Sequence, residues 1–240
     1  MTEMLCHTDS YLKTFTTKVI GIDEITHSIF LERTAFYPGG GGQLCDHGVI
    51  TAGNQKYPVV KVKKSPEGIL HEIAGKSLLP ALETEVSGAI DWERRYQLMR
   101  THTAMHILCS VVFRDYGAQV TGGDMEPLKG RMDFEFENLS KELVAVIEAA
   151  VNKEVSAARD VRGKILPREE TYRIPDLIRT KINPLPPGIP EVRTIEIVGL
   201  DLQADGGTHV ANTREVGQMR IVDYKSKGKI NKRIYVELDV

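Results

Sequence analysis

The histidines of the segment HTAMH are the side chains of this sequence best placed to do chemistry. His102 and His106 are four positions apart, and on a helix that spacing puts two side chains on one face, with Cβ atoms roughly 5–6 Å apart. A second segment, DGGTH, supplies Asp205 and His209 with the same spacing, but the glycines between them favour a tight turn. Three imidazoles and one carboxylate suit Zn²⁺, which binds nitrogen, sulfur and carboxylate oxygen in a tetrahedron. The sequence therefore predicts one zinc ion per chain, bound by these four residues.

Thr103 separates this motif from that of the zinc proteases. Those enzymes carry a glutamate directly after the first histidine as general base, and this sequence has Thr103 there. A histidine pair at helical spacing can also be structural, or can simply lie on the surface. The gathering of all four candidate ligands in two short segments is what favours a metal site.

The segment TAFYPGGGGQ contains a run of four glycines. Ordering several glycines costs much conformational entropy, so a flexible loop is the ordinary interpretation. The functional alternative is a substrate-binding loop whose bare backbone lets a ligand approach closely, with Thr34 and Gln43 as polar contacts at its two ends. It is not a phosphate-binding P-loop, because the Gly-Lys-Ser/Thr ending is missing. The residues of this loop are Gly39, Gly40, Gly41 and Gly42.

Short segments rich in Val, Ile, Thr and Phe fill the chain from about Tyr11 to Ile90, and they are broken by Gly, Asn and Pro. This composition predicts antiparallel strands. Such a set fits a small closed barrel, because closure leaves no exposed edge. The expected strands are Phe15 to Ile22, Ser28 to Glu32, Gly48 to Ala52, Tyr57 to Lys63, Gly68 to Ile73 and Thr84 to Ile90.

The rest of the chain mixes helices with strands. Asp91 is a candidate N-cap for a helix to about Tyr116 that carries the histidine pair, with an apolar core face along one side, and Ser140 is the N-cap of a second helix to about Arg159. Gly122 and Gly123 predict a turn. Later strands are expected at Gly130 to Phe136, Lys164 to Arg173, Arg193 to Val198, Met219 to Tyr224 and Lys232 to Leu238, and a short helix at Pro175 to Lys181.

These elements predict an α+β protein with two domains. Residues 1–90 would form a small antiparallel β-barrel that carries the glycine-rich motif. Residues 91–240 would form a two-layer α+β domain in which helices pack on an antiparallel sheet and the zinc is bound.

The composition is that of an ordinary globular protein without a strong charge. Lys and Arg number 31 against 33 Asp and Glu, which gives a formal charge of -2, so RNA contact would need a local basic patch. The densest cluster is either a solvated hairpin tip or a contact for phosphates. It consists of Lys225, Lys227, Lys229, Lys232 and Arg233.

The cysteines and the apolar runs bear on the cellular compartment. The three cysteines are odd in number and widely spaced, which argues against a disulfide framework. No apolar run has the length of a membrane span, and the N-terminal stretch lacks the apolar region of a signal peptide. We therefore expect no membrane partner and a cytoplasmic location.

Arg131 and Asp133 lie two positions apart in the segment RMDFEF, whose polar and apolar residues alternate. On a strand these two side chains share one face. They are either a simple ion pair or members of a functional site.

Four motifs in the same order resemble the editing domain of alanyl-tRNA synthetase and the freestanding AlaX trans-editing proteins. They are TAFYPGGGGQ, HTAMHIL, RMDFEF and GGTHV, and the resemblance runs from about Thr34 to the C-terminus. The glycine-rich segment ahead of the histidine motif is similar to the medium-length AlaX type. Because the sequence begins at Met1 without a P-loop or an ATP-dependent domain ahead of the editing region, we expect a freestanding editor.

The resemblance implies hydrolysis of mischarged Ser-tRNA(Ala), with Gly-tRNA(Ala) as a second candidate substrate and Ala-tRNA(Ala) spared. It makes His102, His106 and His209 zinc ligands. The family commonly has a cysteine where this chain has Asp205, which is then either a harder oxygen ligand or an outer residue beside an open site. Zinc would either activate the attacking water or hold the amino group and ribose of the substrate.

Thr34 and Gln43 are candidates to hydrogen-bond the serine hydroxyl that alanine lacks, and Arg131 and Asp133 are further catalytic candidates. Two other classes of function stay open. One is a zinc-dependent hydrolase of small esters or amides, and the other is a non-catalytic tRNA-binding module with a structural zinc.

Overall fold

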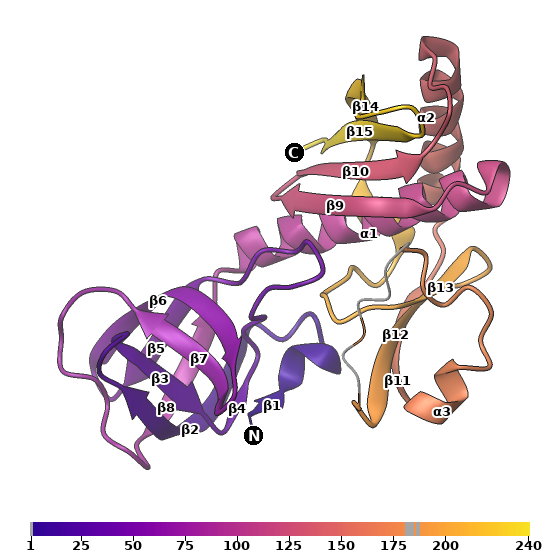
Figure 1. Ribbon diagram of the computed structural model, residues 1–240. Coiled ribbons are helices and arrows are strands. Elements are labelled where there is room, and N and C mark those ends of the chain that lie inside the picture. Colours follow the sequence, from indigo (N-terminus) through magenta and orange to yellow (C-terminus); the bar gives the residue numbers. More distant parts are fainter. Residues whose placement is uncertain (1, 181–184, 186–187) are drawn as a thin grey trace. The chain divides into compact units, whose positions relative to one another are not determined.

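The computed structural model describes residues 2–180, 185 and 188–240, and Figure 1 shows its elements. The chain separates into two compact units, Met1–Tyr96 and Gln97–Val240, and helix α1 (Trp92–Tyr116) begins in the first unit and continues in the second. The expected α+β class is confirmed by a closed barrel, further antiparallel sheets and few helices. The division into domains at residue 90 stays a prediction. No helix of the described ranges has both the length and the apolar character to span a membrane.

The first unit is a closed barrel of antiparallel strands, as the sequence predicts. The strands follow one another around it in the order β2, β3, β7, β6, β5, β8. Exposed and buried residues alternate along the whole of β8, so Val86 and Ile90 enter the core while Ala89 is exposed. Beside the barrel, β1 (Glu3–Met4) pairs with β4 (Arg33–Thr34) and leads into the short helix η1 (Leu5–His7). The barrel strands are β2 (Thr14–Asp23), β3 (Ser28–Leu31), β5 (Gly48–Ala52), β6 (Gln55–Ser65), β7 (Gly68–Ile73) and β8 (Glu85–Ile90).

The glycine run forms a hydrogen-bonded turn in the first unit. The backbones of Gly40 and Gln43 exchange two hydrogen bonds of 3.0 Å. Gly41 and Gly42 between them have φ of +60° and +86°, and positive φ at both central residues is what a type I′ turn requires. Glycine reaches this conformation without steric cost, so the run serves a defined backbone shape.

A buried ion pair ties the ends of this turn segment to the start of α1. The side chains of Arg95 and Asp46 are both 0% exposed, and the guanidinium Nε donates to the Asp46 carboxylate at 2.9 Å. The same guanidinium donates to the carbonyls of Ala35 and Ser10 at 2.7 and 3.0 Å. Asp46 also accepts a 2.6 Å hydrogen bond from the backbone N–H of Tyr37. One arginine therefore holds three separate segments of the first unit.

The second unit contains two antiparallel sheets. The larger sheet has the strand order β14, β15, β10, β9, and the smaller has the order β11, β12, β13. Helix α1 packs on the larger sheet, because Gly130 in β10 leaves room for Met105: a Cβ at Gly130 would lie 2.7 Å from the Met105 sulfur. The remaining elements are β9 (Val120–Glu126), β10 (Lys129–Glu135), α2 (Lys141–Ser156), β11 (Val161–Pro167), α3 (Arg168–Thr171), β12 (Glu191–Ile197), β13 (Asp201–Ala204), η2 (Thr213–Val216), β14 (Met219–Ser226) and β15 (Asn231–Leu238).

Several local predictions in the second unit are wrong. Gly122 and Gly123 lie inside β9, where they pair with β10, and the chain turns only after Glu126. The strand expected from Lys164 to Arg173 ends at Pro167, and the short helix α3 follows it directly. The short helix expected at residues 175–181 is absent from residues 175–180, while residue 181 lies outside the described residues. The short strand β13 was not predicted.

Helix α1 is buried more completely than an amphipathic helix. Every residue from Thr101 to Val112 is buried, although a single core face was expected. A helix covered on all sides is typical of a protein interior. The polar side chains in this stretch, including His102 and His106, therefore need partners within the protein.

We expect Asp46→Ala to lower the free energy of unfolding of the first unit by about 3–5 kcal/mol, because it leaves the buried Arg95 charge without its carboxylate. Lys18→Ala is the matched control. It removes an exposed pair with a Lys18 to Glu83 distance of 3.6 Å, which should change the free energy of unfolding by less than about 1 kcal/mol. Urea denaturation measures both changes, and equal losses would contradict this assignment.

Candidate metal centre

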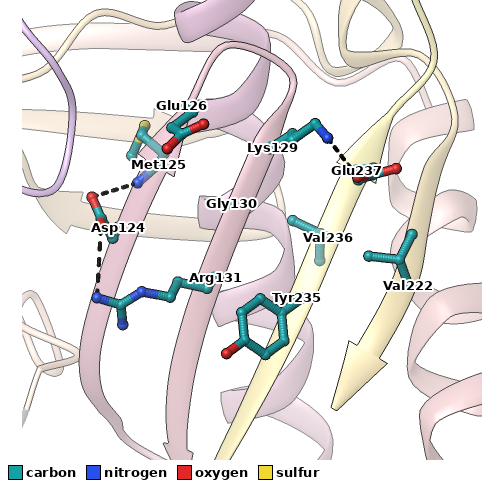
Figure 2. A pocket seen from close by; sticks show the side chains of 10 residues that line it. All are labelled: Asp124, Met125, Glu126, Lys129, Gly130, Arg131, Val222, Tyr235, Val236 and Glu237. Atoms are coloured by element: carbon teal, nitrogen blue, oxygen red, sulfur yellow. Dashed lines mark hydrogen bonds and ion pairs between the residues drawn. The ribbon is translucent and has the colours of Figure 1, made fainter.

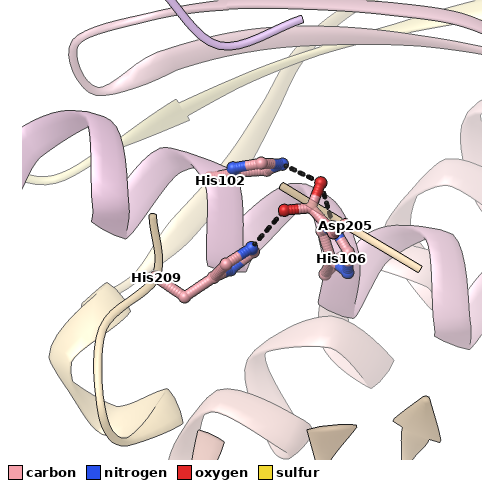
Figure 3. A group of neighbouring side chains, drawn as sticks. All are labelled: His102, His106, Asp205 and His209. Carbon is pink, nitrogen blue, oxygen red and sulfur yellow. Dashed lines mark hydrogen bonds and ion pairs between the residues drawn. The ribbon is translucent and has the colours of Figure 1, made fainter. Parts of the chain in front are cut away.

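The four predicted ligands lie together in the second unit (Figure 3). Each offers one ligand atom, and these atoms all lie within 4.8 Å of one another. Nε2 of His102 and of His106 are 3.4 and 3.9 Å from Oδ1 of Asp205, and Nε2 of His209 is 3.1 Å from its Oδ2. The three imidazoles thus converge on one carboxylate.

Two different local structures bring these side chains together. His102 and His106 project from consecutive turns of α1, and their ring centroids are 5.1 Å apart. Asp205 follows directly after β13, and its carboxylate accepts a 2.5 Å hydrogen bond from the backbone N–H of Gly207. This bond closes the turn that sends His209 back toward Asp205, as the glycines predicted.

Arg193 supports the same turn from the neighbouring strand β12. Its guanidinium Nη1 donates to the carbonyls of Asp205 and Gly207 at 3.1 and 2.6 Å. Its own carbonyl accepts from the Asp205 N–H at 3.0 Å. The turn is therefore fixed by side-chain and backbone bonds on both sides.

Burial and mutual proximity set the charges of the group. Burial alone raises the pKa of Asp205, but the electrostatic influence of the nearby His102 and hydrogen bonds from the three imidazoles lower it, and the net pKa is well below its usual range. Burial, followed by the nearby His102, lowers the pKa of His209 well below its usual value. At neutral pH the group therefore presents an ionised carboxylate and a neutral His209 imidazole, the forms that bind metals.

The donor set fits a metal ion. Tetrahedral zinc with bonds of about 2.0–2.2 Å places its ligand atoms roughly 3.3–3.6 Å apart, close to the 3.1–3.9 Å between Asp205 and the imidazoles. His102 and His209 are 3% and 4% exposed, so a cation here would be shielded from water. A positive ion would also compensate the burial of a carboxylate among polar groups.

Comparison with known proteins identifies the family. A sequence model described as "Threonyl and Alanyl tRNA synthetase second additional domain" matches residues 192–235, which include Asp205 and His209, and one described as "tRNA synthetases class II (A)" matches residues 7–94. The alanyl-tRNA editing protein AlaX-M of Saccharolobus solfataricus is 40% identical to this chain over 98% of both proteins. The chain belongs to the AlaX-M family of alanyl-tRNA editing proteins. The resemblance seen in the motifs is confirmed.

Other relatives agree with this membership. The AlaX-M protein of Methanosarcina barkeri is 35% identical over 99% of each chain. An alanine–tRNA ligase of Ignicoccus hospitalis is 38% identical over 92% of this chain, and the match covers 24% of the ligase. This chain is thus similar to a limited part of that synthetase.

Thr34 lies in the first unit, where its hydroxyl contacts His71. Both residues are 0% exposed, and Thr34 Oγ1 is 2.9 Å from His71 Nε2. His71 Nδ1 is 3.3 Å from the carbonyl of Ile29, which can only accept, so Nδ1 carries the ring proton. Thr34 therefore donates to Nε2, and its oxygen accepts from the N–H of Phe36 at 3.2 Å.

Gln43 closes the glycine turn and is 3% exposed. Its backbone bonds to Gly40, and the carbonyl of Gly40 also accepts a 3.0 Å hydrogen bond from the Tyr37 hydroxyl. The glycines from Gly39 to Gly42 thus belong to a turn that is fixed at both ends. The role of this segment in substrate binding stays a prediction.

Asp133 on β10 pairs mainly with Arg233. The Arg233 Nε and Nη2 donate to its two carboxylate oxygens at 2.6 and 2.8 Å, whereas Arg131 Nη1 is 3.9 Å away. The hydrogen bond from Arg233 holds the pKa of Asp133 below its usual value, although burial opposes it. Arg131 also lies 3.6 Å from Asp124. A simple Arg131 to Asp133 pair is therefore only part of this network.

Not all of the predicted basic cluster projects into solvent. Lys225 is exposed but pairs with Asp223 at 3.0 Å, and the half-buried Arg233 is bound to Asp133. Lys232 is 8% exposed and donates to the carbonyls of Gly228 and Lys229 at 2.8 and 2.9 Å. The exposed cations at the tip of the β14 and β15 hairpin are Lys227 and Lys229.

A groove of about 240 Å³ lies on the larger sheet (Figure 2). Its charges are largely matched, since Lys129 lies 2.9 Å from Glu237 and Arg131 lies 3.6 Å from Asp124. None of the four metal-ligand candidates lines it. The groove is therefore a feature separate from the metal group.

Reasoning from the sequence missed several residues that support these sites. His71 is a lone histidine within a strand, Arg193 lies in a strand of mixed polar and apolar residues, and Thr103 stands out only as a difference from the zinc-protease motif. No spacing rule links these residues to partners far away in the chain. Only the fold shows that they contact Thr34, the Asp205 turn and His209.

The buried His71 predicts a pH dependence of stability. Burial lowers the pKa of His71 from 6.5 to about 4, against the opposing effect of its hydrogen bonds to the Ile29 and Ile69 backbones. His71 therefore binds a proton near pH 6.5 in the unfolded chain but only near pH 4 in the folded chain. The stability difference between the wild type and His71→Gln should be constant above pH 7 and should shrink by about 3 kcal/mol as the pH falls to 4.

Chemical denaturation at several pH values measures this difference, and titration of the metal group cancels because both proteins contain it. A difference that stays constant from pH 7 to pH 4 would show that His71 titrates normally in the fold.

Proposed function

We propose that this chain is a zinc-dependent trans-editing enzyme that hydrolyses the ester of Ser-tRNA(Ala) and spares Ala-tRNA(Ala). Membership of an alanyl-tRNA editing family makes the chain an aminoacyl-tRNA deacylase, which is an ester hydrolase. The observation that carries the proposal is the buried group of three imidazoles and one carboxylate in a chain that matches AlaX-M along its whole length. Mischarged tRNA(Ala) is the proposed partner.

Zinc is the proposed ion because of the donors. Three imidazole nitrogens favour zinc over magnesium or calcium, which prefer oxygen ligands. Asp205 stands where the family commonly has cysteine, so we expect weaker zinc affinity than a thiolate would give. When bound, zinc supplies a Lewis acid and a fixed positive charge to the reacting ester or its water.

The protein itself has a limited task in this reaction. An aminoacyl ester is already labile, so positioning of the ester and a water, together with stabilisation of the developing oxyanion, is most of the catalysis required. His102, His106, Asp205 and His209 would hold the ion in a nearly dry group. Electrostatic interactions are stronger there than in water.

Thr34 is the proposed sensor of the serine hydroxyl. Its hydroxyl proton is directed at His71, and one lone pair of its oxygen accepts from Phe36. In any further hydrogen bond the Thr34 hydroxyl can therefore only be the acceptor, through its other lone pair. A serine hydroxyl can donate to it, whereas the methyl group of alanine cannot. A site that hydrogen-bonds a hydroxyl penalises a substrate without one, because the polar group of the site is then left unpaired.

The glycine turn and Gln43 are proposed as further contacts for the amino acid of the substrate. Glycines 39–42 have no side chains to block a close approach of the substrate, and Gln43 offers an amide for a second polar contact. Glycine on tRNA has no hydroxyl, so any release of glycine would not depend on Thr34. Arg131 and Asp133 are proposed as further catalytic-site residues.

The hairpin formed by β14 and β15 is the proposed contact for the tRNA backbone. Lys227 and Lys229 are exposed at its tip, and Lys225, Lys232 and Arg233 lie beside them. Such cations bind phosphates without reading sequence. Because Arg233 and Lys225 are engaged by carboxylates, we expect Lys227 and Lys229 to provide most of the attraction.

A comparison of substrates separates this proposal from the other two classes of function. We expect the zinc-loaded protein to hydrolyse Ser-tRNA(Ala) with a kcat/KM at least about a thousandfold above that for serine methyl ester, because binding of the tRNA positions the ester. Comparable values for both substrates would indicate a small-ester hydrolase. Tight tRNA binding without release of serine would indicate a non-catalytic module.

Thr34→Val tests the proposed selectivity. The variant keeps the shape of the side chain but removes the hydroxyl, so kcat/KM for Ser-tRNA(Ala) should fall by about tenfold to a hundredfold. Hydrolysis of Gly-tRNA(Ala), where the wild type shows it, should change little. Thr34→Ser is the control and should retain most of the activity. An unchanged preference for serine over alanine in Thr34→Val would refute the role of this hydroxyl.

A further inference from the structure

We infer that Thr103 is a positioning residue that determines which ring nitrogen of His209 is available to the metal. The inference rests on the proposed metal centre. Thr103 lies between His102 and His106 on α1 and is 0% exposed. Its Oγ1 is 3.2 Å from Nδ1 of His209 and also accepts a 3.2 Å hydrogen bond from the backbone N–H of Val210. The residue that rules out a zinc-protease motif therefore contacts a metal ligand.

The two ring nitrogens of His209 have distinct surroundings. Nε2 faces the other ligands and is 3.1 Å from Asp205 Oδ2, whereas Nδ1 faces the Thr103 hydroxyl. A neutral imidazole that binds a metal through Nε2 carries its proton on Nδ1, and this proton needs an acceptor. Thr103 Oγ1 has two lone pairs, of which Val210 occupies one. The other lone pair is placed to accept from Nδ1.

The hydroxyl also fixes the position of the ring. Thr103 is held by its helix, and Val210 directly follows His209, so one oxygen atom connects α1 to both the backbone and the side chain of the ligand segment. A histidine that binds a metal commonly donates its second N–H to such a partner, and loss of the partner typically weakens metal binding 10–100-fold. A valine would fill the same space but could not accept either hydrogen bond.

Thr101 provides a matched control on the same helix. It is also 0% exposed, and its Oγ1 donates to the Gln97 carbonyl at 2.9 Å and accepts from the Leu128 N–H at 2.9 Å. No imidazole contact is found for Thr101 in the described part of the chain. Thr101→Val therefore removes hydrogen bonds of the same kind from the same helix without touching a metal ligand.

The test measures zinc affinity directly by competition with a chromophoric chelator at constant pH. We expect Thr103→Val to raise the zinc Kd by 10–100-fold, and Thr103→Ser, which retains the hydroxyl, to stay within about threefold of the wild type. Thr101→Val should retain the wild-type Kd even where it lowers the Tm. Equal Kd values for Thr103→Val and the wild type, or equal losses in both valine variants, would overturn the inference.

Nitrogen-15 NMR of the zinc-loaded wild type gives a second readout that does not depend on a variant that folds. The His209 ring should carry its proton on Nδ1, and a proton on Nε2 would overturn the inference. A wild-type protein that binds no zinc would remove the proposed zinc centre together with this role. A wild-type protein that binds zinc with a Kd that Thr103→Val leaves unchanged would remove only the role of Thr103.

Discussion

The structure of the second unit depends on one constraint, the burial of three imidazoles and a carboxylate around a single point. Polar groups removed from water must find partners, and a charged carboxylate requires more compensation than a neutral group. Asp205 meets all three imidazoles at 3.1–3.9 Å. A bound cation would satisfy all four groups together, which explains why a helix that is otherwise a core element carries two histidines.

In the first unit, a buried charge is compensated by an ion pair. Arg95 and Asp46 are both fully buried, and together they fix the ends of the segment that contains the glycine turn. The neutral pair of Thr34 and His71 lies in the same unit and orients a hydroxyl without a charge. In both units, buried polar contacts between distant parts of the chain position the groups to which we assign the chemistry.

Local rules predicted the barrel and the ligand cluster well. The alternation of β8 and the i, i+4 spacing of His102 and His106 act over a few residues, so the sequence alone reveals them. Predictions failed where tertiary contacts override local preference, as in β9, where Gly122 and Gly123 are held by pairing with β10. The contacts of Arg95 with Asp46 and of Thr103 with His209 join residues 49 and 106 positions apart, beyond the reach of any local pattern.

We assign the hydrolysis of a mischarged tRNA to the metal group. The most direct test measures release of serine from Ser-tRNA(Ala) by the zinc-loaded protein, after removal of the metal by a chelator, and after zinc is restored, with Ala-tRNA(Ala) as control. We expect rapid release of serine that is lost with the metal and recovered with zinc, while alanine stays attached throughout. Undiminished release by protein shown to be free of metal would contradict it.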